Sequence, residues 1–190
     1  MSTRQQIFFA AMSLFARQGY DGVTMEQIAR AAGLTKGAVY YFFRNKAELF
    51  CTIMDEGISY IDGQCRSILE AARSNREIAR EIISFYINIA YDNASLFLIL
   101  FGSRSAAPEI RALFDERIRN LLLCLGNAFQ AGVDDGLLNP VDPDALGRAF
   151  VGMIYGLLSL PNPPNRAAAS DLVRMLLETG VYASEKEKKA

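Results

Sequence analysis

The sequence predicts an all-α fold of about nine helices, and three observations lead to it. Apolar residues recur at helical spacing, as Ile7, Ala11, Leu14 and Phe15 do near the N-terminus. Glycine, proline and short polar runs separate the helical stretches. Neither an alternating strand pattern nor an internal repeat occurs in the 190 residues.

Three short helices and one long helix are expected first. The second opens at Thr24, which has capping-box spacing to Gln27, and Gly33 ends it. Asn45 caps the fourth helix, with Glu48 three residues further on. The expected ranges are 3–18, 24–33, 35–43 and 46–72.

Five further helices follow, separated at Asn93, near Ser103, at the turn cluster "DDGLLNPVDP" and at "PNPPN". Their expected ranges are 76–92, 95–105, 108–132, 144–160 and 166–183. We divide the chain into a three-helix helix-turn-helix domain at 1–47, a larger helical domain at 48–184 and a disordered tail at 185–190.

Composition excludes several classes of protein. Histidine, the commonest general base and metal ligand, is absent, and the three cysteines lack the spacing of a zinc site. We therefore expect no enzyme activity, no metal and no cofactor. Buried small side chains are the simplest interpretation of Cys51, Cys65 and Cys124, with redox sensing as the alternative.

The N-terminus raises the question of location. No apolar run approaches the roughly 20 residues that span a bilayer. Arg4 before "IFFAAMSLFA" is reminiscent of a secretory signal, but the helical stripe in this segment favours a retained first helix. We expect a cytoplasmic protein.

Charge differs between the two ends of the chain. The net charge is −1, yet residues 1–50 hold six basic and three acidic side chains. This balance favours an anionic partner for the N-terminal end, although a solvated surface is the simpler interpretation.

The third helix separates into two faces. At 100° per residue, an exposed face and a core face are predicted. The exposed face holds Lys36, Gly37, Tyr40, Tyr41 and Arg44, and the core face holds Ala38, Val39, Phe42 and Phe43. A helical glycine costs about 1 kcal/mol against alanine, so Gly37 is either a tolerated defect or a place of close approach.

Hydroxyl and ammonium donors surround this glycine. Tyr40 and Tyr41 are either partly buried rings or donors, and Thr35, Lys36 and Lys46 lie near them in sequence. Such donors suit a phosphate backbone beside a DNA groove. The second and third helices, joined by "AAGLT", form a helix-turn-helix whose second helix would enter the major groove; an ordinary helical bundle is the alternative.

The segment "FARQGYDGVTMEQIARAAGLTKGAVYYFFRNKAELF" resembles the DNA-binding domain of the TetR (tetracycline repressor) family of bacterial transcriptional regulators. The resemblance runs from about Ile7 to Phe50. It rests on a combination of residues: Ala11, Leu14, Phe15, Gly19, Thr24, Ile28, Ala29, Ala32, Gly33, Gly37, Tyr40, Phe43, Lys46 and Leu49. The remaining chain matches this family only in helical layout.

This resemblance implies a set of DNA contacts. Lys36 and Gly37 would lie nearest the base edges, and the other members would meet phosphates. The implied DNA-binding residues are Thr24, Thr35, Lys36, Gly37, Tyr40, Tyr41 and Lys46. Phe42 departs from the family, which often has a polar histidine there, so we leave it out of the set.

The resemblance also implies that the larger domain dimerises and senses a ligand. The apolar helix "GRAFVGMIYGLLSL" must be covered on all sides, by a second subunit or within a monomer. The implied dimer interface is Gly152, Ile154, Tyr155, Gly156, Leu172 and Leu176. The implied effector pocket, for which a solid core is the alternative, is Phe85, Tyr86, Ile89, Phe97, Phe101, Arg104, Phe114 and Ile118.

The expected function is that of a homodimeric repressor. It would bind a palindromic operator in double-stranded DNA and be released by a small, mainly hydrophobic effector, with no membrane partner. Three alternatives stay open: a ligand-responsive activator, a helical sensor that does not bind DNA, and an enzyme. An enzyme would need carboxylates such as Asp134 and Asp135, which Gly136 places in a turn.

Overall fold

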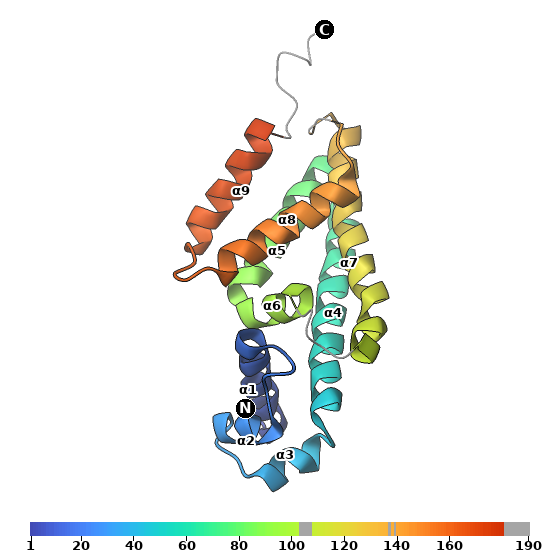
Figure 1. The fold of residues 1–190 in the computed structure, drawn as a ribbon. Coiled ribbons are helices and arrows are strands. Elements are labelled where there is room, and N and C mark those ends of the chain that lie inside the picture. Colours follow the sequence, from blue (N-terminus) through green and yellow to red (C-terminus); the bar gives the residue numbers. More distant parts are fainter. Residues whose placement is uncertain (103–107, 137, 139, 181–190) are drawn as a thin grey trace. The chain divides into compact units, whose positions relative to one another are not determined.

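The computed structural model describes residues 1–102, 108–136, 138 and 140–180; the side chains of residues 108, 109, 111, 113, 174 and 176–180 are outside this description. In the described part the backbone forms nine helices (Figure 1), which confirms the predicted all-α fold. They are α1 (Thr3–Gln18), α2 (Met25–Ala31), α3 (Lys36–Phe42), α4 (Lys46–Ala71), α5 (Asn75–Asp92), α6 (Ala94–Gly102), α7 (Pro108–Asp134), α8 (Pro143–Ser159) and α9 (Arg166–Gly180). The tail predicted to be disordered lies outside the described residues.

The chain folds as two compact units. Unit 1 comprises Met1–Tyr60 and Asn93–Ile118, and unit 2 comprises Ile61–Asp92 and Arg119–Ala190. The helices α4 and α7 therefore contribute residues to both units. The predicted boundary at residue 47 divides a DNA-binding domain from a sensing domain, whereas the two units are defined by internal contacts. This boundary stays a prediction.

Unit 1 is built on the apolar stripe of α1. All four predicted stripe residues are buried, which confirms that this face meets the core: Ile7, Ala11, Leu14 and Phe15. Helix α1 packs against α2 and α6. The Phe15 ring lies 5.2 Å from the Phe50 ring and 5.9 Å from the Tyr20 ring, centroid to centroid. This aromatic cluster ties the start of α4 to α1.

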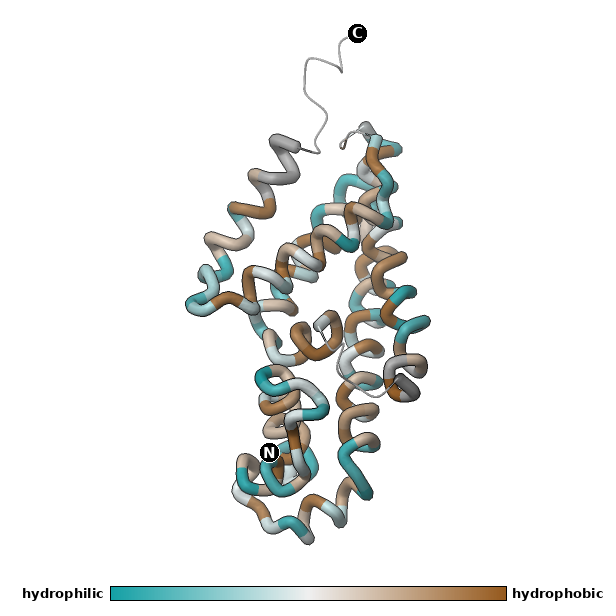
Figure 2. The backbone as a smooth tube through the Cα atoms, in the orientation of Figure 1, coloured by the Kyte–Doolittle hydropathy of each residue, from teal (hydrophilic) through white to brown (hydrophobic). Residues whose placement is uncertain are grey.

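Helix α6 completes unit 1, and most of its residues are hydrophobic (Figure 2). A glycine lets it approach α4: a Cβ atom on Gly57 would lie 2.6 Å from Leu96 Cδ1. A side chain at position 57 would require at least the Leu96 side chain to shift. Here a helical glycine is explained by internal packing.

Unit 2 has an aromatic core centred on α5. Tyr86 is fully buried, and its hydroxyl donates to the Leu121 carbonyl oxygen at 3.0 Å. Its ring faces Phe150, which in turn contacts Phe129. Helix α5 packs against α8 and α9, and an ion pair between Arg166 and Asp92 joins the start of α9 to the end of α5.

The seventh helix continues past the glycine at which its predicted range ends. A Cβ atom on Gly132 would lie 2.9 Å from Leu138 Cδ1, so this glycine makes room for the chain that folds back over it. The helix ends at Asp134, and Gly136 adopts a left-handed conformation with φ of 62°. The turn at Gly136, and not Gly132, therefore determines where α7 ends.

Among the described residues no single helix is long and apolar enough to cross a membrane. The consecutive helices α5 and α6 reach the required length and hydropathy when they are counted together as a bent pair. Each buries apolar side chains within its own unit, for example Ile82 in α5 and Ile99 in α6.

Candidate nucleic-acid interface

The helix-turn-helix is fixed by reciprocal caps. The Gln27 backbone N–H donates to Thr24 Oγ1 at 3.2 Å, and the Thr24 N–H donates to Gln27 Oε1 at 2.7 Å. After α2, Gly33 takes φ of 68°, and the Leu34 N–H donates to the Ala29 carbonyl oxygen at 2.9 Å. This arrangement is a Schellman motif, which turns the chain sharply into α3.

Helix α3 starts with a cap and ends in extended chain. Thr35 Oγ1 accepts the Ala38 N–H at 3.2 Å, and Phe43 leaves the helix with φ of −138°. Val39 is fully buried and Phe43 nearly so. These two side chains hold the short helix on the core and leave its other face outward.

The outward face of α3 has a gap between donors. A Cβ atom on Gly37 would meet only Thr35 Oγ1, at 4.0 Å, so the backbone there is open to a partner. One turn further, Tyr40 is 42 % exposed and Tyr41 is 84 % exposed. The tyrosines predicted on this face do lie on it, together with exposed Thr24, Thr35 and Lys36.

The predicted inward position of Phe42 is wrong. Its side chain is 37 % exposed, and its ring stands edge to face against Tyr41, with centroids 5.1 Å apart. Phe42 is the last residue of α3 and lies 60° around the helix from Val39 at 100° per residue. The wheel position alone would keep Phe42 near the core, but α3 ends at this residue and the extended chain from Phe43 leaves the Phe42 ring exposed.

Lys36 is paired in this structure. Its ammonium forms an ion pair with Glu26 of α2, and both side chains are about half exposed. The hydrogen bond from Lys36 holds the pKa of Glu26 below its usual value, and Glu26 raises the pKa of Lys36. Base-edge contact by Lys36 would require this ammonium to leave or share Glu26.

Lys46 is also engaged. Its Nζ donates to the Tyr20 carbonyl oxygen at 2.8 Å and lies 4.2 Å from the centroid of the Tyr20 ring. An ammonium has three N–H donors, so this bond leaves donors for a phosphate. Asn45 accepts the Glu48 N–H at 2.8 Å, which confirms the predicted cap of α4.

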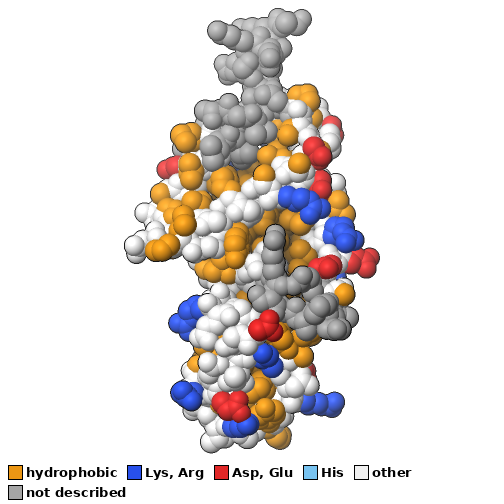
Figure 3. Space-filling model, in the orientation of Figure 1, with side chains coloured by type: hydrophobic (Ala, Val, Ile, Leu, Met, Phe, Trp, Pro, Cys, Tyr) orange, Lys and Arg blue, Asp and Glu red, His pale blue; other side chains and the backbone are white. Residues whose placement is uncertain are grey.

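Other cations accompany these residues on unit 1, where Lys and Arg side chains stand on the surface with carboxylates among them (Figure 3). Arg44 is exposed immediately after α3, and the helical wheel placed it beside Tyr40 and Tyr41. Arg44 is not among the implied DNA contacts, although it lies on the same predicted face. Phe42, also outside that set, is exposed next to Tyr41.

The implied dimer residues fall on α8 and α9 of unit 2. Gly152 and Gly156 are exposed, and a Cβ atom on either would meet nothing within 4 Å. Tyr155 and Leu172 are half-buried, whereas Ile154 is buried within the chain. The side chain of Leu176 lies outside the described residues.

The implied effector residues are divided between the units. Tyr86 and Ile89 are buried in unit 2, with Phe85 half-buried. Unit 1 holds the rest: buried Phe97 and Phe114, and half-buried Phe101 and Ile118. Arg104 lies outside the described residues. None of these residues lines either of two surface clefts. One cleft, of about 350 Å³, has Ser67 and Glu81 among its lining residues. The other, of about 460 Å³, has Met1 and Ala32 among them.

The carboxylates considered for an enzyme make ordinary surface contacts. Asp134 accepts a hydrogen bond from Gln130 at 2.7 Å, and Asp135 accepts one from Asn75 at 3.4 Å. Within the described residues no group of three or more Cys, Asp or Glu side chains is arranged to hold a metal ion.

Comparison with known proteins supports the helix-turn-helix interpretation. Residues 7–52 match the family model described as "Bacterial regulatory proteins, tetR family", which confirms the resemblance predicted from the motif. The fatty acid metabolism regulator protein of Bacillus subtilis is 25 % identical over 69 % of this chain and 68 % of its own length.

Solved structures extend the likeness to nearly the whole chain. AibR in complex with isovaleryl coenzyme A and operator DNA is 26 % identical, with a TM-score of 0.76 over 92 % of this chain and 97 % of its own. The ketosteroid transcriptional regulator KstR2 of Mycobacterium tuberculosis, 17 % identical, has a TM-score of 0.82 over 96 % of each chain, which shows a shared fold.

Proposed function

We propose that this chain, which belongs to the TetR family of DNA-binding transcriptional regulators, is a homodimeric repressor that a small hydrophobic effector releases from a palindromic operator. The observation that carries the proposal is the outward face of α3, where Gly37 leaves the backbone open beside two exposed tyrosines. Among the described residues, no internal packing accounts for this face. The protein would act in the cytoplasm and not as an enzyme.

The proposed DNA contacts use groups that remain able to donate. The hydroxyl oxygens of Thr24 and Thr35 already accept backbone N–H groups, while their hydrogens can still bond to phosphate oxygens. Tyr40 and Tyr41 would donate to phosphates, and Lys36 and Gly37 would approach the base edges. Lys46 would reach a phosphate from the start of α4.

The proposed dimer brings together α8 and α9 of two subunits. Gly152 and Gly156 lie one turn apart on α8 and would allow close approach of the partner's helices. Leu160, at the end of α8, is 59 % exposed, and the partner's helices would bury it in the proposed dimer. A twofold dimer would place two recognition helices roughly 34 Å apart, which suits a palindrome on one face of DNA.

The proposed effector is mainly hydrophobic. Aromatic side chains line the interior of each unit, including Phe85, Tyr86, Phe97 and Phe101. Acyl-coenzyme A thioesters are the first class to test, because AibR binds isovaleryl coenzyme A. Helix α4 carries Lys46 in unit 1 and also supplies residues to unit 2, so it is the candidate element for coupling the two sites.

The experiment is selection of duplexes from random-sequence DNA by the purified protein, followed by titration of the selected duplex. Enrichment of a palindrome, with a steep fall in affinity as salt rises, is expected. Isovaleryl coenzyme A and free coenzyme A are then added as ligand and control. Release by the thioester supports a repressor, tighter binding supports the activator alternative, and absence of enrichment contradicts DNA binding.

A further inference from the structure

A carboxylate lies among the proposed DNA contacts. Glu26 is in the first turn of α2, two residues after the cap Thr24. Its side chain forms an ion pair with Lys36, the first residue of α3, and both side chains are about half exposed. The pair therefore joins the two helices of the helix-turn-helix on a solvent-exposed surface. A carboxylate and DNA phosphates repel each other, so Glu26 opposes binding unless it has a further role.

The pair holds the Lys36 side chain in one direction. The Lys36 Nζ atom contacts Glu26 Oε1 and lies 5.7 Å from the centroid of the Tyr40 ring, within the range of a cation–π contact. Tyr40 is four residues further along α3, so its ring lies beside the lysine. The hydrogen bond from Lys36 holds the pKa of Glu26 below its usual value, so both groups are charged at neutral pH. The pair is neutral overall.

This pairing affects two kinds of DNA contact differently. A contact to a phosphate depends on the positive charge of the ammonium, which the Glu26 carboxylate offsets. A contact to a base edge depends on N–H donors, of which an ammonium has three, and the bond to Glu26 uses one. Two donors remain for O6 and N7 of a guanine, which lysine binds in the major groove. The pair therefore weakens attraction to phosphates more than a contact to a matching base.

We propose that Glu26 is a positioning residue: by pairing with Lys36 it keeps this ammonium from the phosphates of nonspecific DNA and so sharpens discrimination between the operator and other sequences. This inference rests on the proposed function, because it takes the outward face of α3 to be the DNA-binding surface. On nonspecific DNA, Lys36 would have to leave Glu26 to neutralise a phosphate. At a matching guanine, Lys36 keeps its bond to Glu26 and donates to the base as well.

A simpler role for Glu26 is stabilisation of α2. A carboxylate in the first turn of a helix interacts favourably with the helix N-terminus. Loss of this interaction would lower the stability of a variant without changing the number of phosphates that the protein neutralises. The dependence of DNA affinity on salt reports that number, so it separates the two roles.

The test is titration of a random-sequence duplex with Glu26→Gln at several salt concentrations. Glutamine has nearly the same shape as glutamate but no charge, so Lys36 becomes free to neutralise a phosphate. For each subunit on the duplex, we expect affinity at low salt to rise about fivefold, the scale of an exposed ion pair. The slope of log affinity against log salt should steepen by about 0.9 per subunit. Affinity for the selected palindrome should rise less, so the ratio of the two affinities should fall.

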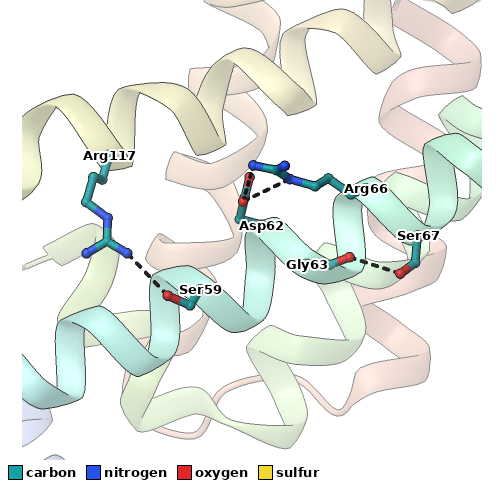
Figure 4. A network of polar contacts seen from close by, with 6 residues as sticks. All are labelled: Ser59, Asp62, Gly63, Arg66, Ser67 and Arg117. Atoms are coloured by element: carbon teal, nitrogen blue, oxygen red, sulfur yellow. Dashed lines mark hydrogen bonds and ion pairs between the residues drawn. The ribbon is translucent and has the colours of Figure 1, made fainter.

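Asp62→Asn is the matched control. Arg66 donates to Asp62 Oδ2 at 2.8 Å and 3.1 Å from the next turn of α4, as Figure 4 shows. This ion pair is also largely exposed, and Asp62 and Arg66 belong to unit 2, which holds no proposed DNA contact. Asp62→Asn removes one negative charge and frees one cation, as Glu26→Gln does. It should leave both the salt slope and the affinity ratio unaltered.

A Lys36→Met background shows whether Glu26 acts through Lys36. In this background Glu26→Gln should have less than half of its effect on the salt slope, because it frees no ammonium. The proposal is overturned if Glu26→Gln behaves like Asp62→Asn, or if its effect is equally large with Lys36→Met. In either case, selection of a palindrome by the unmodified protein would leave the proposed function standing. Absence of DNA binding by the unmodified protein would contradict both.

Discussion

The outward face of α3 and the contact between α4 and α6, both in unit 1, each contain a helical glycine in opposite surroundings. A Cβ atom on Gly57 would strike Leu96 at 2.6 Å, whereas one on Gly37 would meet nothing closer than 4.0 Å. Internal packing of the Leu96 side chain therefore favours glycine at position 57. Gly37 weakens its helix by up to about 1 kcal/mol, and no contact of the described residues compensates for it.

The same contrast divides unit 2. A Cβ atom on Gly132 of α7 would lie 2.9 Å from Leu138 Cδ1, so the packing of Leu138 favours glycine there, but Gly152 and Gly156 of α8 face open space. Open surroundings are what a close outside partner would need, and they also occur on helix faces that stay in solvent. Gly63 of α4 is also open and exposed, and no proposed surface includes it, so it provides a matched control.

The largest effect is expected at α8. Gly156→Glu should leave the monomer folded, since the new side chain enters open space, but it would bury a carboxylate in the proposed dimer. Sedimentation should show monomers, and affinity for a palindromic operator should fall about 100-fold or more, because one half-site is lost. Gly63→Glu makes the same chemical change and should affect neither measurement. A dimeric Gly156→Glu protein with normal affinity would remove α8 from the interface.

Local features of unit 1 could be predicted from the sequence. Caps, turns and faces of the helix-turn-helix depend on residues within a few positions of each other, so Thr24, Gly33, Thr35 and Asn45 could be assigned from spacing alone. Phe42 was misplaced because the wheel assumes a helix that continues, and α3 stops there. Local rules predict elements well except at their ends.

Contacts between distant segments could not be predicted. The ion pair of Lys36 with Glu26 and the bond of Lys46 to the Tyr20 carbonyl both join residues that no periodicity relates. Residues proposed for the effector site belong to both units, and their arrangement depends on packing that the pattern of apolar residues does not encode.

At Gly37 we expect a smaller effect, in which stability rises while operator affinity falls. Gly37→Leu should raise the free energy of unfolding by up to about 1 kcal/mol, because leucine favours a helix and its side chain would enter open space. Operator affinity should fall by tenfold or so, on the scale of one lost base contact of about 1–3 kcal/mol. Chemical denaturation and DNA titration measure the two quantities. A variant with unchanged affinity would mean that Gly37 is a tolerated defect.

The smallest effect separates the two roles of Lys46. Lys46→Met keeps the aliphatic stem against Tyr20 but removes the ammonium and its bond to the Tyr20 carbonyl oxygen. If the ammonium also neutralises one phosphate, the slope of log affinity against log salt should become shallower by about one, equally for operator and random DNA. Arg80→Gln makes the same charge change on the exposed side of α5 and should leave the slope unaltered. An unchanged slope in Lys46→Met, together with reduced stability, would mean that Lys46 only stabilises the fold through Tyr20. Gly37, Tyr40 and Tyr41 of α3 would then form the DNA interface without Lys46.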